Sequence, residues 1–225
     1  NFLKQNNIKS YLIDSELILS SISGKPRENF LVNSDIKLNK SQINCFNNLI
    51  FRRGICKEPI AYLLNKKEFW SIKLNVEKGV LIPRPETEIL VDKLVKYYDL
   101  ENPFILDVGT GSGCIIISLL QELKRSKGVA IDISIKALKV AQNNSKINNT
   151  FDRIRFINTS ISQLNNFKFD LIVSNPPYIA RHQLKNLEDD IKNFEPKIAL
   201  DGGNDGLDVI KKVIYKSKTI LKVKG

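Results

Sequence analysis

The chain has no methionine, one histidine and only three cysteines among its 225 residues. The cysteines, Cys45, Cys56 and Cys114, are far apart and form no Cys-x-x-Cys pair, which excludes a disulfide framework and a cysteine zinc site. We therefore expect a reducing, cytoplasmic environment and no metal. The single histidine, His182, receives no catalytic role. Because methionine is absent, we do not expect residue 1 to be the native start.

Long hydrophobic runs are missing as well. The longest, residues 114–120, falls far short of the ~20 residues that a membrane-spanning helix needs, so no membrane span is expected. Basic residues outnumber acidic ones by 35 to 24, which gives a net charge of +11. No basic cluster with interleaved aromatic residues stands out. We interpret the excess as solvated surface and expect no direct nucleic-acid binding; an RNA or a ribosome-bound partner is the alternative.

The hydrophobic pattern divides the chain into three parts. Residues 1–66 carry broad apolar stripes at helical spacing, which predicts a small helical domain. Residues 67–84 alternate apolar and polar positions around a turn, which predicts a β-hairpin linker. Over residues 85–225 helical and strand patterns alternate, which is typical of an α/β domain with a doubly wound, mostly parallel sheet. The chain ends where another strand is due, so we expect the last strands of the sheet to be missing.

The stretch "DVGTGSGC", residues 107–114, joins the first predicted strand of this sheet to a helix. Its alternating glycines allow a tight turn and a close approach of a ligand to the main chain. A dinucleotide-binding GxGxxG fingerprint would need its third glycine at position 114, where Cys114 stands. Asp107 suits a ligand with an amino group and a sulfonium charge better than it suits a pyrophosphate.

A second carboxylate, Asp132, follows the next predicted strand. Carboxylates at this position hydrogen-bond ribose hydroxyls in doubly wound folds. Thr159 and Ser160 end the third strand, where they would flank an adenine ring. Together these features indicate S-adenosylmethionine rather than NAD. The alternative is a glycine turn with structural aspartates.

The fourth predicted strand ends in "SNPPY", residues 174–178. In a doubly wound sheet it would end beside the glycine-rich turn, at the edge where ligands bind. The side-chain oxygen of Asn175 and the backbone oxygen of Pro176 can accept both hydrogens of a planar NH₂ group and hold its nitrogen in line with a sulfonium methyl. The prolines fix these carbonyls, and Tyr178 offers a face on which the target plane packs. The acceptor would be adenine, guanine or glutamine.

The chain resembles the release-factor glutamine methyltransferases, the HemK/PrmC family, over nearly its whole length. The resemblance lies in "EPIAYLLNKKEFW" (58–70), "VLIPRPETEILV" (80–91), "DVGTGSGC" (107–114), "SNPPYI" (174–179) and "FEPKIALDGGNDGL" (194–207). It implies a helical substrate-recognition domain, a hairpin linker and a Rossmann-like methyltransferase domain. The implied reaction, in translation termination, is S-adenosyl-L-methionine-dependent methylation of the side-chain amide of the glutamine in the Gly-Gly-Gln loop of peptide chain release factors. These factors are the expected partners, and we expect a monomer.

The resemblance also implies roles for single residues. The implied catalytic residues are Asn175, Pro176, Pro177 and Tyr178. The implied cofactor-binding residues are Asp107, Gly109, Thr110, Gly111, Ser112, Gly113, Asp132, Ser160 and Asn175. The implied substrate-binding residues are Phe69, Arg84, Glu86, Asn175, Pro176, Pro177 and Tyr178, braced by Glu195 and Pro196. Two positions depart from the family pattern: Asn65 replaces a usual glycine of the linker, and Ser160 stands where an aromatic ring often covers the adenine.

Three other functions fit parts of the sequence. A ribosomal-protein glutamine methyltransferase would share much of the architecture, and the resemblance of "IPRPETE", residues 82–88, favours the release-factor branch. An adenine or guanine amino-group methyltransferase would use the same motif on a flipped base, but the target-recognition domain or basic groove that it usually needs is not seen. A binding module or inactive remnant is disfavoured by the intact set of Asp107, Asp132 and Asn175.

Overall fold

The structure is a computed structural model that describes residues 2–32, 37–98 and 101–223. Its internal contacts divide the chain into two units. The first unit is Asn1–Asn65 with Asp189–Phe194, and the second is Lys66–Glu188 with Glu195–Gly225. The sequence pattern did not lead us to expect the grouping of 189–194 with the N-terminal helices.

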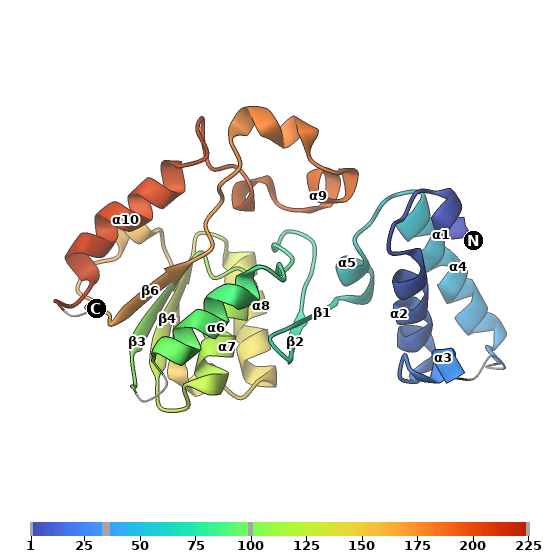
Figure 1. Cartoon of the computed structure of the whole chain (residues 1–225), viewed down its shortest axis with the longest axis horizontal. Helices are drawn as coiled ribbons and strands as arrows, with labels where there is room; N and C mark the ends of the chain where they lie inside the picture. Colours follow the sequence, from blue (N-terminus) through green and yellow to red (C-terminus); the bar gives the residue numbers. More distant parts are fainter. Residues whose placement is uncertain (1, 33–36, 99–100, 224–225) are drawn as a thin grey trace. The chain divides into compact units, whose positions relative to one another are not determined.

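The first unit consists of helices (Figure 1). Their bounds are α1 Phe2–Gln5, α2 Tyr11–Ser23, α3 Asn29–Val32, α4 Lys40–Gly54, α5 Ile60–Leu64 and α9 Asp189–Phe194. Helix α2 ends at Gly24, which takes a left-handed φ of 69°. Helix α4 begins with a capping box formed by Asn39 and Gln42. A buried ion pair joins the two helices, because Arg53 Nε donates to Asp14 Oδ2 at 2.7 Å.

Asn65 ends α5 in the left-handed conformation, with φ 53°. Among residues with a side chain, asparagine is one of the few that adopt this region at low cost. The backbone geometry therefore explains how asparagine can stand at a position where the family pattern has glycine.

A β-hairpin opens the second unit. Strands β1 (Lys66–Phe69) and β2 (Ile72–Asn75) pair antiparallel with Phe69 opposite Ile72, so Trp70 and Ser71 form a two-residue loop. Both loop residues have positive φ, 49° and 58°, as a type I′ turn requires. Trp70 is held in place, since its indole Nε1 donates to Glu122 Oε1 at 2.8 Å. The hairpin strands end at residue 75, earlier than the predicted linker end at 84.

Ser71 is exposed and pays a conformational cost in this turn. We expect Ser71→Gly to raise the free energy of unfolding by about 0.5–1 kcal/mol, because glycine adopts positive φ without a Cβ clash, partly offset by its greater freedom in the unfolded chain. Urea denaturation measures the difference. Ser71→Ala keeps the Cβ and should not raise the free energy of unfolding. A glycine variant less stable than the original chain would contradict the claim that Ser71 is strained.

The second unit is built on a four-stranded parallel sheet with the order β5-β4-β3-β6. The strands are β3 Phe104–Val108, β4 Lys127–Asp132, β5 Ile154–Asn158 and β6 Leu171–Ser174. The helices are α6 Thr87–Tyr97, α7 Cys114–Glu122, α8 Ile135–Ile147 and α10 Asp208–Ile220, with short 3₁₀ turns at η1 Phe151–Arg153, η2 Ile161–Gln163, η3 Arg181–Asn186 and η4 Lys197–Ala199. This sheet confirms the predicted α/β fold class.

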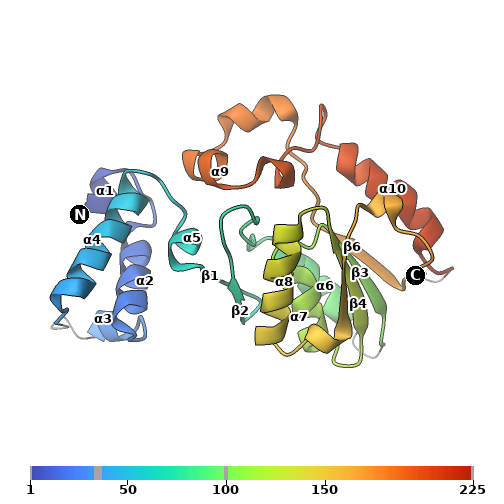
Figure 2. The ribbon, with the colours of Figure 1, turned by 180° about the vertical axis from the view of Figure 1, so that it is seen from behind.

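Each face of the sheet has its own hydrophobic core. Successive residues of a strand point to opposite faces. Ile105 accordingly joins the cluster of α6 and α7, whereas its neighbour Leu106 joins the cluster that includes Ile220 of α10. Figures 1 and 2 show α6, α7 and α8 on one side of the sheet and α10 on the other. The strands are therefore buried on both faces, as their continuous apolar sequences predict.

The strand order reverses next to β3. The chain runs outward from β3 through β4 to β5 and then returns to place β6 on the other side of β3. Beyond β6, Leu221 forms a parallel bridge with Phe169, so the chain after α10 starts to pair along that side. The chain therefore leaves the carboxyl ends of β3 and β6 in opposite directions along the sheet. The point between these two strands is a topological switch point, which is where ligands bind in open α/β sheets.

Candidate active site

A cavity of about 560 Å³ opens at the carboxyl ends of β3, β4 and β6. Its size is that of a small-molecule site. Predicted cofactor residues and predicted catalytic residues both line it. Those among its lining are Gly109, Thr110, Gly111, Ser112, Asp132, Ser160, Asn175, Pro176 and Pro177.

The glycine-rich turn forms one wall of the cavity and leads into α7. Gly113 precedes that helix with φ 82°, and a Cβ there would lie 2.8 Å from Ile117 Cδ1, so only glycine fits without a shift. Gly113 itself packs beneath the turn, while Gly109 to Ser112 face the cavity. The turn lies at the N-terminus of α7, where backbone N–H groups can meet an acceptor on a ligand.

Asp107 lies under this turn at the end of β3, with 1% of its surface exposed. Thr110 Oγ1 donates to its Oδ2 at 2.8 Å, while Oδ1 is buried and makes no hydrogen bond of ordinary geometry with the described residues, although the backbone N–H of Ile116 lies near enough to lower the pKa. Asp107 is not among the residues that line the cavity. Burial raises the pKa of Asp107 to about 7, against the lowering effect of the Thr110 hydrogen bond. An unpaired buried carboxylate oxygen favours a cationic or hydrogen-bond-donating ligand.

Asp132 ends β4 and holds the glycine turn. Its Oδ2 accepts from the amide of Gly111 at 2.9 Å, and its Oδ1 accepts from the amide of Ser134 at 2.8 Å. Each carboxylate oxygen keeps further acceptor capacity. The sequence suggested a ligand contact for Asp132 but not this second contact, which shapes the turn before any ligand arrives.

Asn175 enters the cavity from the end of β6. The preceding Ser174 is fixed by a 2.7 Å hydrogen bond from its Oγ to the carbonyl of Val108 on β3. Asn175 Nδ2 donates to Thr87 Oγ1 at 3.2 Å, which ties the motif to the first residue of α6. Sequence reasoning passed over Thr87, although it lies inside the "PRPETE" corner.

Arg84 also lines the cavity and is fixed from behind. Its Nη2 donates to Glu195 Oε1 at 2.7 Å, and the Glu195 side chain is only 2% exposed. The structure thus brings together the two segments, around residues 84 and 195, that were expected to brace the pocket. Pro196 lies along the same wall.

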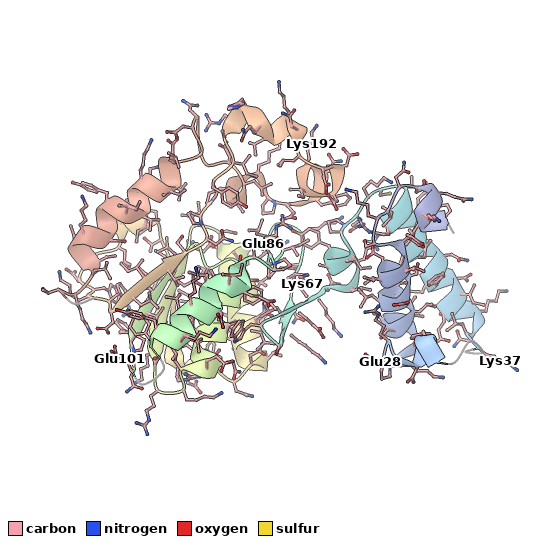
Figure 3. The ribbon with its side chains drawn as sticks, viewed as in Figure 1. Glu28, Lys37, Lys67, Glu86, Glu101 and Lys192 are labelled. Carbon is pink, nitrogen blue, oxygen red and sulfur yellow. The ribbon has the colours of Figure 1, made fainter. Side chains whose placement is uncertain are left out.

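Three predicted substrate residues are not brought into the cavity. Phe69 is 1% exposed and packs in the core cluster with Leu74 and Val91, because its position in β1 turns it toward the buried face. Glu86 is exposed at the start of α6 (Figure 3). Tyr178 is 64% exposed and is not among the cavity-lining residues. Phe69 therefore packs in the core of the second unit, and its expected contact with substrate stays a prediction.

The one cysteine among the described cavity-lining residues, Cys114, is not a thiolate nucleophile. Burial raises the pKa of the Cys114 thiol to about 12, so it stays protonated at neutral pH. Among the described residues no group of three or more histidine, cysteine, aspartate or glutamate side chains could hold a metal ion. Within the same ranges, no helix has the length and apolar character to cross a membrane.

Comparison with known proteins identifies both parts of the chain. Residues 1–64 match the family model "PrmC N-terminal domain", and residues 85–193 match "Methyltransferase small domain". A release factor glutamine methyltransferase of Clostridium acetobutylicum is 38% identical over 99% of this chain and 79% of its own length. That of Caulobacter vibrioides is 36% identical over 99% of this chain and 78% of its own.

Two further matches differ in extent. A bifunctional methyltransferase of Rickettsia typhi is 38% identical over 95% of this chain, which spans only 45% of that protein. The catalytic domain of hMettl16, solved with an RNA hairpin, superposes with a TM-score of 0.54 at 15% identity, covering 84% of this chain and 67% of that one. At that identity the second likeness concerns the fold alone.

These matches agree with the motifs and with the sheet. They confirm the enzyme class predicted from sequence, a methyltransferase, and S-adenosyl-L-methionine as its cofactor. The chain belongs to the release factor glutamine methyltransferase family.

Proposed function

We propose that this protein transfers a methyl group from S-adenosyl-L-methionine to the side-chain amide nitrogen of the glutamine in the Gly-Gly-Gln loop of peptide chain release factors. One observation carries the proposal: Asn175, Pro176 and Pro177 line the same cavity as the glycine turn and Asp132. The names of the relatives from Clostridium acetobutylicum and Caulobacter vibrioides support the choice of substrate.

The residues of the cavity, together with Asp107 beneath its glycine turn, fit the cofactor. The buried Oδ1 of Asp107, which makes no hydrogen bond of ordinary geometry with the described residues, suits an ammonium or N–H group. Asp132 and the backbone of Gly109 to Ser112 would bind the ribose and the adjoining atoms, and Ser160 would lie beside the adenine. The bound cofactor supplies an electrophilic methyl group on a sulfonium sulfur.

The acceptor amide would be held by two oxygens. Asn175 Oδ1 and the Pro176 carbonyl would accept the two N–H hydrogens of the glutamine side chain, while Pro177 keeps the main chain rigid. This fixes the nitrogen in the cavity and stabilises the positive charge that develops on it during transfer. A proton leaves the nitrogen afterwards, so no enzyme nucleophile or metal ligand is required. Tyr178 follows this motif directly in sequence and Arg84 lines the same cavity, and both would contact the incoming loop.

We further propose the following division of the chain. Residues 1–66 form a substrate-recognition domain, residues 67–84 a linker and residues 85–225 the catalytic domain. The release factor is the partner, nucleic acid is not bound directly, and the enzyme acts as a cytoplasmic monomer.

The test offers three acceptors separately, each with methyl-labelled S-adenosyl-L-methionine. They are a release factor, the same factor with its Gly-Gly-Gln glutamine changed to alanine, and duplex DNA. Label in the first acceptor alone is the expected result. Label in DNA would move the protein to base methylation. No label in any of them, with the cofactor bound, would indicate a different protein amide, such as one on a ribosomal protein.

Asp107 gives a prediction for pH. Because burial raises its pKa to about 7, the folded protein without ligand holds a proton that the unfolded chain releases near pH 4. The protonated carboxyl therefore favours folding at low pH, and that contribution is lost as pH rises from the unfolded pKa to about 7. Binding of a cationic amino group requires the ionised form, so cofactor affinity should rise up to roughly tenfold per pH unit until about pH 7 and then level off.

Calorimetric titrations between about pH 5.5 and 8 would measure this dependence. Asp107→Asn should weaken binding at pH 8 and flatten the profile at lower pH, whereas Asp152→Asn, a change at an exposed aspartate, should leave it as it was. If cofactor affinity depended on pH as steeply in Asp107→Asn as in the original protein, the pH dependence would come from a group other than Asp107.

A further inference from the structure

We propose that Thr87 is a positioning residue that anchors the Asn175 carboxamide and leaves its Oδ1 for the substrate. Asn175 Nδ2 donates to Thr87 Oγ1 at 3.2 Å. With its donor end held in this way, the amide presents its acceptor end, Oδ1, to a substrate in the cavity. The inference rests on the proposed function, in which Oδ1 accepts an N–H of the target amide.

The orientation matters because a carboxamide has two chemically different ends of nearly equal size. If the side chain turned by half a rotation, its NH₂ group would face the NH₂ group of the substrate. Two donors would then oppose each other, and the substrate nitrogen would lose one of its two acceptors. In the observed arrangement the Thr87 hydroxyl accepts from Nδ2 and leaves Oδ1 for the substrate. Because a hydroxyl can also donate, Thr87 anchors the amide at this point, and the N–H of the substrate selects the end that faces it, without Thr87 touching the reacting atoms.

Thr87 is itself well fixed. Its side chain belongs to a residue only 9% exposed, at the start of α6, and its amide donates to the carbonyl of Arg84 at 3.0 Å. Arg84 in turn makes the 2.7 Å ion pair with the buried Glu195. Contacts from Glu195 through Arg84 and Thr87 thus reach Asn175, which lies 88 residues from Thr87 in sequence.

This series of contacts indicates what the "PRPETE" corner, residues 83–88, does: it holds the Asn175 side chain in place. Both Arg84 and Thr87 line the cavity, but their side chains bond protein groups: Arg84 bonds Glu195, which holds the corner, and Thr87 bonds the Asn175 amide. The corner would act through Asn175 and so affect the rate of transfer more than the binding of either ligand.

The test compares Thr87→Val, which keeps the shape and removes the hydroxyl, with Thr87→Ser, which keeps the hydroxyl. We expect Thr87→Val to lower kcat for release-factor methylation about tenfold, the effect of losing one hydrogen bond that orients a reacting group, with KM and cofactor Kd within about twofold. Thr87→Ser should stay within about threefold of the original kcat. Thr150→Val changes a buried threonine outside the cavity and should leave kcat unchanged.

A double-mutant cycle distinguishes positioning of Asn175 from any other effect. In an Asn175→Ala background, Thr87→Val should cause no further loss, because the amide that it orients is gone. A full additional loss, or a serine variant as slow as the valine variant, would overturn the proposal. So would an unchanged kcat in Thr87→Val.

A second measurement needs no substrate and covers the case of a variant that fails to fold. The Asn175 side-chain NH₂ signals, assigned by their disappearance in Asn175→Ala, should be protected from hydrogen exchange in the original protein and lose that protection in Thr87→Val. If the Asn175 NH₂ hydrogens of the original protein exchanged as fast as those of exposed side-chain amides, the hydrogen bond to Thr87 would be contradicted. If the original protein labels no release factor, the proposed function fails, whereas this exchange result still decides the Thr87 contact.

Discussion

Replacing Asn175 by alanine is expected to lower turnover with the release factor on the order of 10²–10³-fold. That is the usual cost of removing one preorganised polar group from the point where charge develops in the transition state. Cofactor affinity should fall only modestly, because Asp107, Asp132 and the glycine turn remain. Turnover at saturating cofactor, with cofactor Kd determined separately, measures both quantities.

A matched control uses Asn186, an exposed asparagine in η3. Asn186→Ala should turn over normally, which excludes a general effect of losing an amide. If Asn175→Ala also keeps full turnover, the two-acceptor mechanism is wrong, even if the protein still methylates release factors.

The second large effect is on stability, at Asn144 in α8. This side chain is fully buried and serves three backbone groups of other elements. Its Nδ2 donates to the carbonyls of Asn75 and Ser112, both at 2.9 Å, and its Oδ1 accepts from the amide of Asn75 at 2.7 Å. It therefore connects the end of the hairpin with the glycine turn.

Asn144→Ala should lower the free energy of unfolding by about 2–4 kcal/mol, because the buried carbonyl of Ser112 and two partly buried backbone groups of Asn75 lose their partner, and a buried group left unpaired costs about 1–3 kcal/mol. Cofactor affinity should fall as well, since Ser112 belongs to the turn that lines the cavity. Denaturant unfolding and cofactor titration measure the two effects. The neighbouring Asn143 is exposed on the same helix, so Asn143→Ala should change stability by no more than about 0.5 kcal/mol. Similar values for the two variants would contradict the role of Asn144.

The sequence predicted the catalytic part of the fold well because its periodic segments are long and apolar. The alternation of helices and strands expected over residues 85–225 is observed, for example in α7 at Cys114–Glu122, β4 at Lys127–Asp132 and α8 at Ile135–Ile147. Alternation of strands and helices also fixed the parallel sheet, since short crossovers leave few other topologies. The sequence did not predict that segment 189–194 belongs to the first unit. This grouping depends on contacts with residues far away in sequence, such as the 3.9 Å ion pair of Asp190 with Arg53.

The site was predictable where a local motif carries the chemistry. The glycine turn and "SNPPY" end neighbouring strands, so the sheet brings them to one cavity. The contacts of Asp132 with Gly111 and of Thr87 with Asn175 could not be read from the sequence, because each joins separate elements through a side-chain hydrogen bond. Phe69 lies in the core cluster and not among the cavity-lining residues, since an aromatic residue in a family motif can pack in the core as readily as in a pocket. Its contact with substrate stays a prediction.

The chemical position of the transferred methyl group tests the central claim most directly. Acid hydrolysis of a release factor labelled by this protein would convert an N-methylated glutamine amide to glutamate and labelled methylamine. The account predicts that the label leaves as methylamine and that no label is found when the Gly-Gly-Gln glutamine is alanine. Label that stays on another amino acid, or appears only in nucleic acid, would contradict it.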